Sequence, residues 1–240
     1  MKGIVLAGGT GSRLHPLTKV TNKHLLPIGE KPMVYYPIES LVTSGITDIM
    51  VITGTDQVGN MLSLLGSGDN FGCQFTYRVQ DRPDGVAGAL SLCERFVGDD
   101  SCTVILGDNV FSHNLREDVL EFEEKADNLK CRLFLKSVPD PSRYGIAKIE
   151  GKEITMLVEK PKEYISDLCV CGIYMYDKNV FNAIRSLELS DRKEYEITDV
   201  NDFYLKNGTV TYGMLPGMWT DAGTHTSYQR ANSLVNVKSP

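Results

Sequence analysis

The chain has 240 residues, of which 42% are hydrophobic and 23% charged, proportions that are ordinary for a soluble globular protein. Acidic residues outnumber basic ones by 31 to 25, and the resulting net charge of −6 argues against a broad nucleic-acid-binding face, which is normally basic. No apolar stretch has the form of a signal peptide or the length of a membrane span, so we expect a cytoplasmic protein without a membrane partner.

The first half of the chain alternates short apolar runs with stretches of helical spacing. One of these stretches stops at Gly45, a residue type that often caps the C-terminus of a helix. Short apolar strands that alternate with helices indicate right-handed β-α-β units and a mainly parallel sheet. The predicted strands are Gly3–Ala7, Ile49–Thr53, Phe75–Val79 and Thr103–Leu106, and the predicted helices are Val34–Ser44, Gln57–Leu65, Val86–Phe96 and Leu115–Ala126.

The second half is less regular. The sequence has no low-complexity linker, internal repeat or charge block, so residues 1–240 are predicted to form one domain. The expected fold class is α/β, with a Rossmann-like mixed, mainly parallel sheet flanked by helices. In this half the predicted strands are Arg132–Val138, Ile146–Ile149, Ile154–Glu159, Val170–Tyr176 and Val210–Met214, and the predicted helices are Val180–Leu187, Ile197–Lys206 and Thr224–Val235.

The six cysteines show neither a Cys-x-x-Cys pair nor a Cys/His metal spacing. Cys169 and Cys171 are two residues apart in an apolar run, so on a strand their side chains share one face. We therefore expect free, buried thiols and no zinc site.

A glycine-rich segment, Gly8–Arg13, follows the first predicted strand. Glycines let the backbone turn its N–H groups toward an anion, and the carboxyl edge of a parallel sheet is where such folds bind ligands. A Rossmann fingerprint needs a third glycine where Leu14 stands, and no Walker Gly-Lys-Ser/Thr follows. What remains is a phosphate loop ending in Arg13, with Lys23 farther on, although spacing alone is equally compatible with a plain turn and two solvated cations.

Two aspartates are candidates for a metal site. Asp108 follows the fourth predicted strand, at the same sheet edge as the glycine-rich segment. Asp221 precedes the last predicted helix, and taken alone its position favours helix capping. Brought together beside a triphosphate, the two carboxylates would suit Mg²⁺, which takes one or two carboxylates plus phosphate oxygens and water.

Two further segments offer groups for substrates. Glu159-Lys160-Pro161 ends an apolar strand, where the lysine can neutralise a sugar phosphate and the glutamate can accept hydrogen bonds from sugar hydroxyls. A plain surface turn is the alternative, since proline ends strands. Gln80, which precedes Pro83-Asp84-Gly85, can offer an amide to a base edge or lie in an ordinary polar loop.

In order and position these segments resemble the sugar nucleotidylyltransferase family, and within it the bacterial glucose-1-phosphate thymidylyltransferases. The resemblance runs from Met1 to about Leu234. It implies the nucleotide-diphospho-sugar transferase type of fold, with a nucleotide-binding half at about residues 1–110 and a sugar-phosphate-binding half at about 111–240. The segments that carry it are Leu6–Leu14, Lys23–Pro27, Gly107–Asn109, Arg143–Gly145, Glu159–Pro161 and Trp219–Thr224.

The resemblance implies Mg²⁺-dependent transfer of dTMP from dTTP to glucose 1-phosphate, giving dTDP-glucose and pyrophosphate for deoxysugar (rhamnose-type) polysaccharides. It also implies a homo-oligomer, because relatives commonly self-associate. The implied catalytic residues are Arg13, Lys23 and Asp108, and the implied metal ligands are Asp108 and Asp221. The implied nucleotide-binding residues are Leu6, Gly8, Gly9, Thr10, Gly11, Arg13, Gln80 and Gly85. The implied sugar-phosphate-binding residues are Asn109, Gly145, Glu159, Lys160, Val170 and Tyr174.

The chain departs from the family at several points. Gly88 stands where the family has the glutamine of Gly-Leu-Ala-Gln-Ala, and Cys171 where it has the threonine of Val-Thr-Gly. Both changes leave the base and sugar preference open, so a UTP-dependent or amino-sugar-1-phosphate uridylyltransferase is an alternative. Many relatives continue past the position of Pro240 with helices that build part of an allosteric site, so we expect weaker or altered feedback control by a nucleotide sugar.

Two other classes of protein fit less well. A non-catalytic, nucleotide-sugar-binding regulatory subunit would be expected to have lost Arg13, Lys23 or Asp108, and all three are present. A dinucleotide-dependent oxidoreductase would need the third glycine of its fingerprint, which the chain lacks.

Overall fold

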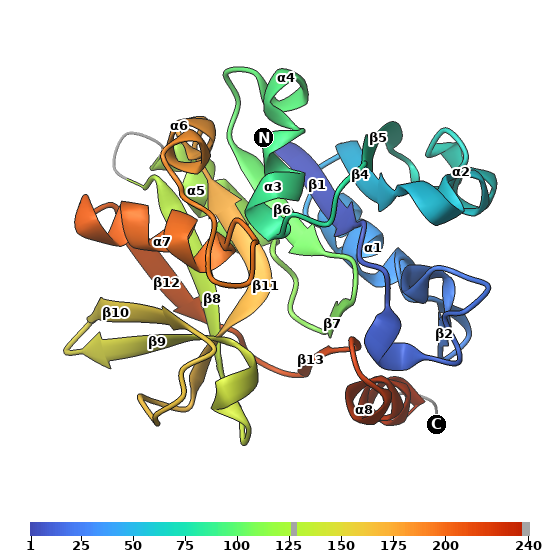
Figure 1. Cartoon of the computed structure of the whole chain (residues 1–240). Coiled ribbons are helices and arrows are strands. Elements are labelled where there is room, and N and C mark those ends of the chain that lie inside the picture. Colours follow the sequence, from blue (N-terminus) through green and yellow to red (C-terminus); the bar gives the residue numbers. More distant parts are fainter. Residues whose placement is uncertain (126–128, 237–240) are drawn as a thin grey trace.

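A computed structural model describes residues 1–125 and 129–236 of the chain (Figure 1). Its centre is a nine-stranded sheet in which seven strands follow the order β10-β9-β11-β6-β1-β4-β5, while β8 and β12 branch off beside β11. The mixed, mainly parallel α/β architecture predicted from the sequence is confirmed. The strands are β1 Lys2–Ala7, β4 Asp48–Gly54, β5 Gln74–Gln80, β6 Cys102–Leu106, β8 Cys131–Ser137, β9 Gly145–Glu150, β10 Glu153–Glu159, β11 Leu168–Tyr176 and β12 Val210–Met214.

The first half of the chain supplies the parallel part of the sheet. β1 pairs in parallel with β4 on one side and β6 on the other, and β5 pairs in parallel with β4. β1 is apolar and buried from Gly3 to Ala7 because helices cover both faces of a parallel sheet. The carboxyl ends of β1, β5 and β6 therefore meet at one edge.

The second half supplies the antiparallel part. β11 pairs antiparallel with β6, β8 and β9, and β9 with β10, whereas β12 lies parallel to β8. Because β11 pairs directly with β6, strands from both halves of the chain belong to one sheet.

Helices form a layer on each face of the sheet (Figure 1). Along β1, Ile4 and Leu6 enter one core and Val5 and Ala7 the other, as the two-residue repeat of a strand requires. The first core includes side chains of α3 Val86–Ser91, α6 Val180–Arg185 and α7 Ile197–Lys206, and the second those of α1 Tyr35–Thr43, α2 Val58–Leu65 and α5 Arg116–Glu124.

Two short ribbons and the last helix complete the fold. β7 Asn109–Phe111 pairs antiparallel with β13 Trp219–Asp221, and β2 Pro27–Ile28 with β3 Lys31–Pro32. A small core containing Ile28, Val110 and Ala231 joins both ribbons to α8 His225–Asn236. The strands of these ribbons were not predicted, because two or three residues are too few for a period to be recognised. Single 3₁₀ turns are η1 Ser12–Leu14, η2 Lys23–Leu25, η3 Thr55–Gln57, η4 Asp69–Phe71 and η5 Pro141–Arg143.

The ends of most predicted helices differ from those observed by one or two residues, and one predicted helix is divided. The helix predicted at Val86–Phe96 is divided into α3 and α4 Glu94–Val97, because the N–H groups of Leu92 and Cys93 bond three residues back rather than four. α5 ends at Glu124, and the predicted endpoint Ala126 lies outside the described residues.

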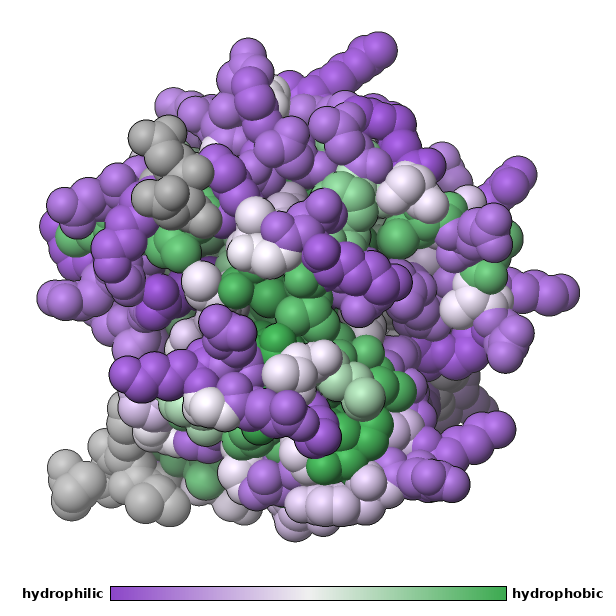
Figure 2. All heavy atoms as spheres, turned by 90° about the vertical axis from the view of Figure 1, so that its left-hand side faces the viewer, coloured by the Kyte–Doolittle hydropathy of each residue, from purple (hydrophilic) through white to green (hydrophobic). Residues whose placement is uncertain are grey.

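Among the described residues, no helix is long and apolar enough to cross a membrane. Figure 2 shows the side of the molecule where α7, β9, β10 and β12 lie in Figure 1, with apolar surface gathered at its centre within a hydrophilic surround. Met156 of β10 and Met214 of β12 are among the exposed large hydrophobic residues. All six cysteines are buried and free, as predicted.

Candidate active site

A cavity of about 620 Å³ lies at the edge where β1, β5 and β6 end. This volume is in the range that accommodates small-molecule ligands. Segments from both halves of the chain line it, so the groups predicted for two substrates face one space. The cavity is lined by all the predicted site residues: Leu6, Gly8, Gly9, Thr10, Gly11, Arg13, Lys23, Gln80, Gly85, Asp108, Asn109, Gly145, Glu159, Lys160, Val170, Tyr174 and Asp221.

The glycine-rich segment is folded tightly against Lys23. Gly11 has a φ of 68°, and its carbonyl accepts a 2.7 Å hydrogen bond from the Thr18 hydroxyl. A Cβ on Gly11 would lie 2.9 Å from the Cβ of Lys23, and one on Gly9 would lie 3.3 Å from its Cε. Glycine is therefore required at Gly11 for conformation as well as space. The following turn, η1, carries Arg13 at the exposed side of the cavity.

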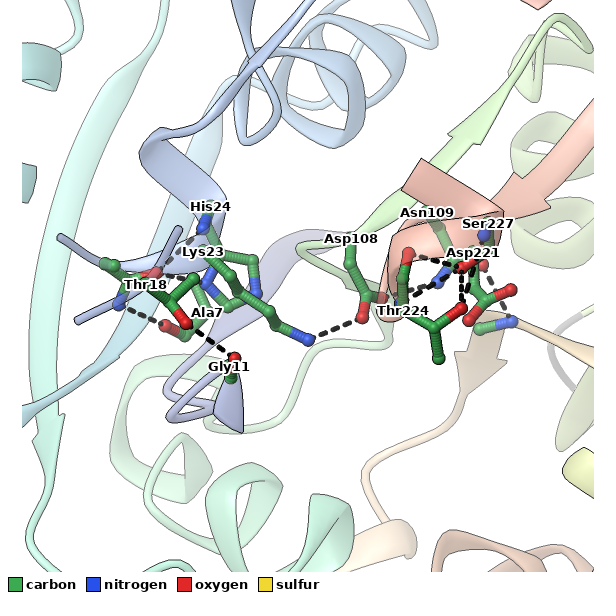
Figure 3. Close-up of polar contacts among 12 residues, drawn as sticks. Ala7, Gly11, Thr18, Lys23, His24, Asp108, Asn109, Asp221, Thr224 and Ser227 are labelled. Atoms are coloured by element: carbon green, nitrogen blue, oxygen red, sulfur yellow. Dashed lines mark hydrogen bonds and ion pairs between the residues drawn. The ribbon is translucent and has the colours of Figure 1, made fainter. Parts of the chain in front are cut away.

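Lys23 and Asp108, which both line the cavity, form a buried ion pair with 2.5 Å between Nζ and Oδ2. Figure 3 shows Asp108 between Lys23 and Asn109, whose amide donates to the other carboxylate oxygen at 3.0 Å. Burial alone would raise the pKa of Asp108, but the charge of Lys23 and these hydrogen bonds hold it well below its usual value. The carboxylate is therefore ionised at neutral pH.

Asp221 reaches the same place from the far end of the chain, because β13 pairs with β7 and sets Asp221 opposite Asn109. Its carboxylate accepts hydrogen bonds from Arg143 Nη2 at 3.1 Å and from the Tyr144 hydroxyl at 2.9 Å. Burial and the nearby Asp221 raise the pKa of Tyr144, so its hydroxyl stays protonated and donates.

The capping role that the position of Asp221 favoured is wrong. At the start of α8 the hydroxyls of Thr224 and Ser227 bond to each other and to each other's backbone N–H groups (Figure 3). These two residues satisfy the helix terminus. The Asp221 carboxylate therefore takes no part in capping and lines the cavity, bonded to Arg143 and Tyr144.

Gly223 leaves the space between the two carboxylates open. The point where its Cβ would lie is 3.2 Å from Asp108 Oδ2, 3.3 Å from Asp221 Oδ2 and 3.4 Å from Arg13 Nη2. Within residues 1–125 and 129–236, no group of three or more His, Cys, Asp or Glu side chains is arranged for a metal ion. A cation here would thus have two carboxylates and draw its other ligands from phosphate and water, which is the preference of Mg²⁺.

The opposite wall carries the groups predicted for a sugar phosphate. Glu159, at the end of β10, accepts hydrogen bonds from Thr198 Oγ1 at 2.6 Å and from Arg192 Nη2 at 3.1 Å. Lys160 has a φ of 43°, which is unfavourable for a residue with a side chain, and its N–H bonds to the Tyr144 carbonyl at 2.9 Å. Strain of this kind persists where the surroundings enforce it, and it is frequent in binding sites.

β11 also lines this side of the cavity. Val170, Gly172 and Tyr174 face the cavity because alternate residues of a strand share a face. Cys171 is buried in the core on the other face together with Cys169. The thiol that stands at Cys171 in place of the family's hydroxyl therefore does not line the cavity.

Several cavity residues were missed by sequence reasoning. The segment before α7 and the helix itself contribute Arg192, Glu196 and Asn201, and Arg192 binds both carboxylate oxygens of Glu196, at 2.6 and 3.0 Å. The charged segment resembles a solvated loop. Asn201, however, occupies a core-facing helical position in line with Ile197 and Tyr204. A polar residue at such a position could have indicated from the sequence that Asn201 belongs to the site.

His24 is also part of the cavity wall. Its Nδ1 lies 2.6 Å from Asn22 Oδ1, and its ring is almost completely buried. Burial, reinforced by the charge of Lys23, lowers the pKa of His24 to about 3, so the imidazole is neutral at physiological pH.

Comparison with known proteins gives consistent matches. A model of the nucleotidyl transferase family matches residues 2–237. Glucose-1-phosphate thymidylyltransferases from Neisseria meningitidis serogroup A and Mycolicibacterium smegmatis are 39% and 40% identical, with 99% of this chain and 83% of each relative aligned. A solved Bacillus anthracis structure assigned to the same activity, in complex with sucrose, has a TM-score of 0.95 at 54% identity and covers 100% of this chain and 97% of that one. UDP-glucose pyrophosphorylase bound to UDP-glucose has a TM-score of 0.87 at 25% identity, covering 99% of each chain.

Proposed function

The chain belongs to the nucleotidyl transferase family, and we propose that it is a glucose-1-phosphate thymidylyltransferase, which joins dTTP and glucose 1-phosphate to give dTDP-glucose and pyrophosphate. One observation carries the proposal. A phosphate loop, a Lys23–Asp108 pair, a second carboxylate and a strained lysine line one cavity large enough for a small-molecule ligand. The named relatives supply the choice of substrates.

Within the cavity, each side takes one substrate. The nucleotide occupies the side built by residues 1–110, with its triphosphate on the segment Gly8–Arg13 and its base near Gln80 and Gly85. Glucose 1-phosphate occupies the side built by residues 111–240, where the Lys160 ammonium neutralises its phosphate and Glu159 accepts hydrogen bonds from its hydroxyls. The reacting phosphates then meet beside Lys23.

The chemistry needs alignment and positive charge rather than a proton relay. A sugar-1-phosphate oxygen is an anion at neutral pH, so it attacks the α-phosphorus of dTTP without a general base and expels pyrophosphate. Arg13 and Lys23 stabilise the negative charge that develops on the phosphates, and binding both substrates in one cavity makes their reaction effectively unimolecular. Asp108 and Asp221 would hold Mg²⁺, which when bound supplies further positive charge to the triphosphate oxygens.

The cellular setting is part of the proposal. The enzyme acts in the cytoplasm, and its dTDP-glucose supplies deoxysugar (rhamnose-type) polysaccharide synthesis. It works as a homo-oligomer, a role for which the apolar surface at the centre of Figure 2 is available. Light scattering on the purified chain tests the oligomer, and a monomer at micromolar concentration would contradict it.

A pyrophosphate-release assay with four nucleoside triphosphates and a panel of sugar 1-phosphates tests the reaction. The expected result is fastest turnover with dTTP and glucose 1-phosphate, dependent on Mg²⁺. Preference for UTP or for an amino-sugar phosphate would instead support the uridylyltransferase alternative. With an α-phosphorothioate substrate of defined configuration, in-line attack inverts the configuration at the α-phosphorus. Net retention of that configuration would contradict a direct transfer.

A further inference from the structure

The side-chain amide of Gln80 has a fixed orientation. Its Nε2 donates to Asp84 Oδ1 at 2.7 Å and to the Gly85 carbonyl at 3.3 Å. With the amide reversed, its oxygen would face a carboxylate and a carbonyl oxygen, and neither can donate a hydrogen. The Gln80 carbonyl oxygen therefore points away from Asp84, toward Gly8, where it is 2.7 Å from the place of a glycine Cβ.

Gly88 makes room for the carboxylate that fixes this amide. The position of a Cβ on Gly88 is occupied by Asp84, whose Oδ1 is 2.4 Å and whose Cγ is 2.6 Å from it. Any side chain at this position would displace the carboxylate from Gln80. The backbone of Asp84 is held independently, since its carbonyl accepts a 2.8 Å hydrogen bond from the Tyr195 N–H. The glycine that replaces the family's glutamine thus has a structural role in this chain.

We propose that Asp84 and Gly88 are positioning residues for base selection, which they exert by locking the Gln80 amide with its acceptor toward the base. The inference rests on the proposed function, because it takes the base of the nucleotide to lie at Gln80. Asp84 is half-buried behind Gln80 and does not line the cavity, so it acts through the glutamine.

The Gln80 carbonyl oxygen, held in this orientation, distinguishes pyrimidine bases by whether N3 carries a hydrogen. Thymine and uracil carry a hydrogen on N3, which the Gln80 oxygen can accept. Cytosine has an unprotonated N3 there, so two acceptors would face each other and neither would be satisfied in a partly buried site. A site built around such a hydrogen bond discriminates strongly against a base that cannot make it. The sequence around Asp84 thereby excludes cytosine nucleotides without distinguishing thymine from uracil.

The test is Asp84→Asn, measured as the ratio of kcat/KM for dTTP to that for dCTP. An asparagine can present either an oxygen or an amide to Gln80, so of the two contacts that fix the amide only the longer one, to the Gly85 carbonyl at 3.3 Å, still opposes its turning to donate to cytosine. We expect the ratio to fall at least about tenfold, the effect of one re-oriented hydrogen bond. Gly88→Ala should act in the same direction by pushing the carboxylate aside. Asp81→Asn is the matched control, an exposed residue of the same loop with the same change of charge, and it should keep the wild-type ratio.

Two outcomes separate this inference from the proposed function. If the wild type turns over dTTP while both Asp84→Asn and Gly88→Ala keep its dTTP-to-dCTP ratio, the positioning role is wrong and the function stands. If the wild type turns over no nucleotide, the function fails, and calorimetric binding of dTTP and dCTP decides the inference. Tighter binding of dTTP, with the difference reduced in Asp84→Asn, supports it. Equal binding, or binding of neither nucleotide by the wild type, overturns it.

Discussion

The ammonium of Lys23 and the carboxylate of Asp108 are each other's nearest counter-charge in the cavity, 2.5 Å apart with only 11% and 12% of the two side chains exposed. Gly9 and Gly11 have no side chains to occupy the space that the Lys23 side chain fills. The pair joins the phosphate loop to the proposed metal site, so a change at either residue alters the charge balance of both.

Asp108→Asn preserves shape and the contact with Asn109 but removes the charge that faces Lys23. We expect kcat in the pyrophosphate-release assay to fall at least about a hundredfold, the scale seen when one electrostatic group is removed from an active site. Circular dichroism should show the wild-type fold. Near-normal turnover with Mg²⁺ would remove Asp108 from the site.

Gly223→Ala places a methyl group between Asp108 and Asp221 without changing any charge. The Mg²⁺ concentration needed for half-maximal activity should rise at least about tenfold, because the methyl group occupies the space where both carboxylates converge. The control is Gly59→Ala, a helical position with nothing within 4 Å of the new Cβ. An unchanged Mg²⁺ requirement in Gly223→Ala would place the metal elsewhere.

Lys160→Ala should raise KM for glucose 1-phosphate by about tenfold or more, the effect of losing one charged hydrogen bond, while KM for dTTP stays unchanged. Lys160→Gly separates the effect of losing the charge from the effect of backbone strain, because glycine tolerates the φ of 43°. The glycine variant should lose sugar-phosphate binding as well, yet unfold at a higher temperature than the alanine variant. A normal KM in both would count against the role of the ammonium.

The stability of the protein should depend on pH through His24. Its pKa is about 3 in the folded state and about 6.5 when the chain is unfolded, so between these values the unfolded chain binds more protons. The free energy of unfolding therefore falls as the pH is lowered from 6.5 toward 3, by up to ~1.4 kcal/mol per pH unit. Urea denaturation between pH 4.5 and 7 measures this slope, which His24→Gln should flatten. Equal slopes for wild type and variant would show that His24 is not responsible.

The parts of the site that follow strand ends could be predicted from the sequence. The segment Gly8–Arg13 directly follows the buried strand β1, and Asp108 lies two residues after the end of β6. Parallel strands bring their carboxyl ends to one edge. The order of strands and helices in the first half was predictable for the same reason, because apolar runs and turn residues are local features. The roles assigned to these residues stay predictions until the variants are made.

The parts that depend on distant pairing could not be predicted from local pattern. Asp221 looked like a helix cap, but Thr224 and Ser227 cap the helix. The pairing of β13 with the distant β7 is what brings Asp221 to the cavity. Arg192 was missed because its partners Glu159 and Glu196 come together only in the folded chain. Cys171 lies in the core rather than in the cavity because of the phase of β11, and shifting a strand by one residue exchanges its two faces.

The ribbon of β7 and β13 contains a fluorescent residue, Trp219, that can report on the formation of the ribbon. Trp219 is the single tryptophan of the chain and lies in β13, 5% exposed, with its indole N–H bonded to Asn109 Oδ1 at 2.8 Å. Closing the long loop between these strands costs chain entropy that a three-residue ribbon offsets only in part, so β13 is expected to detach more readily than the central sheet. Indole fluorescence therefore follows the arrival of Asp221 at Asp108, and recovery of that emission after denaturation should coincide with recovery of turnover rather than with formation of the sheet.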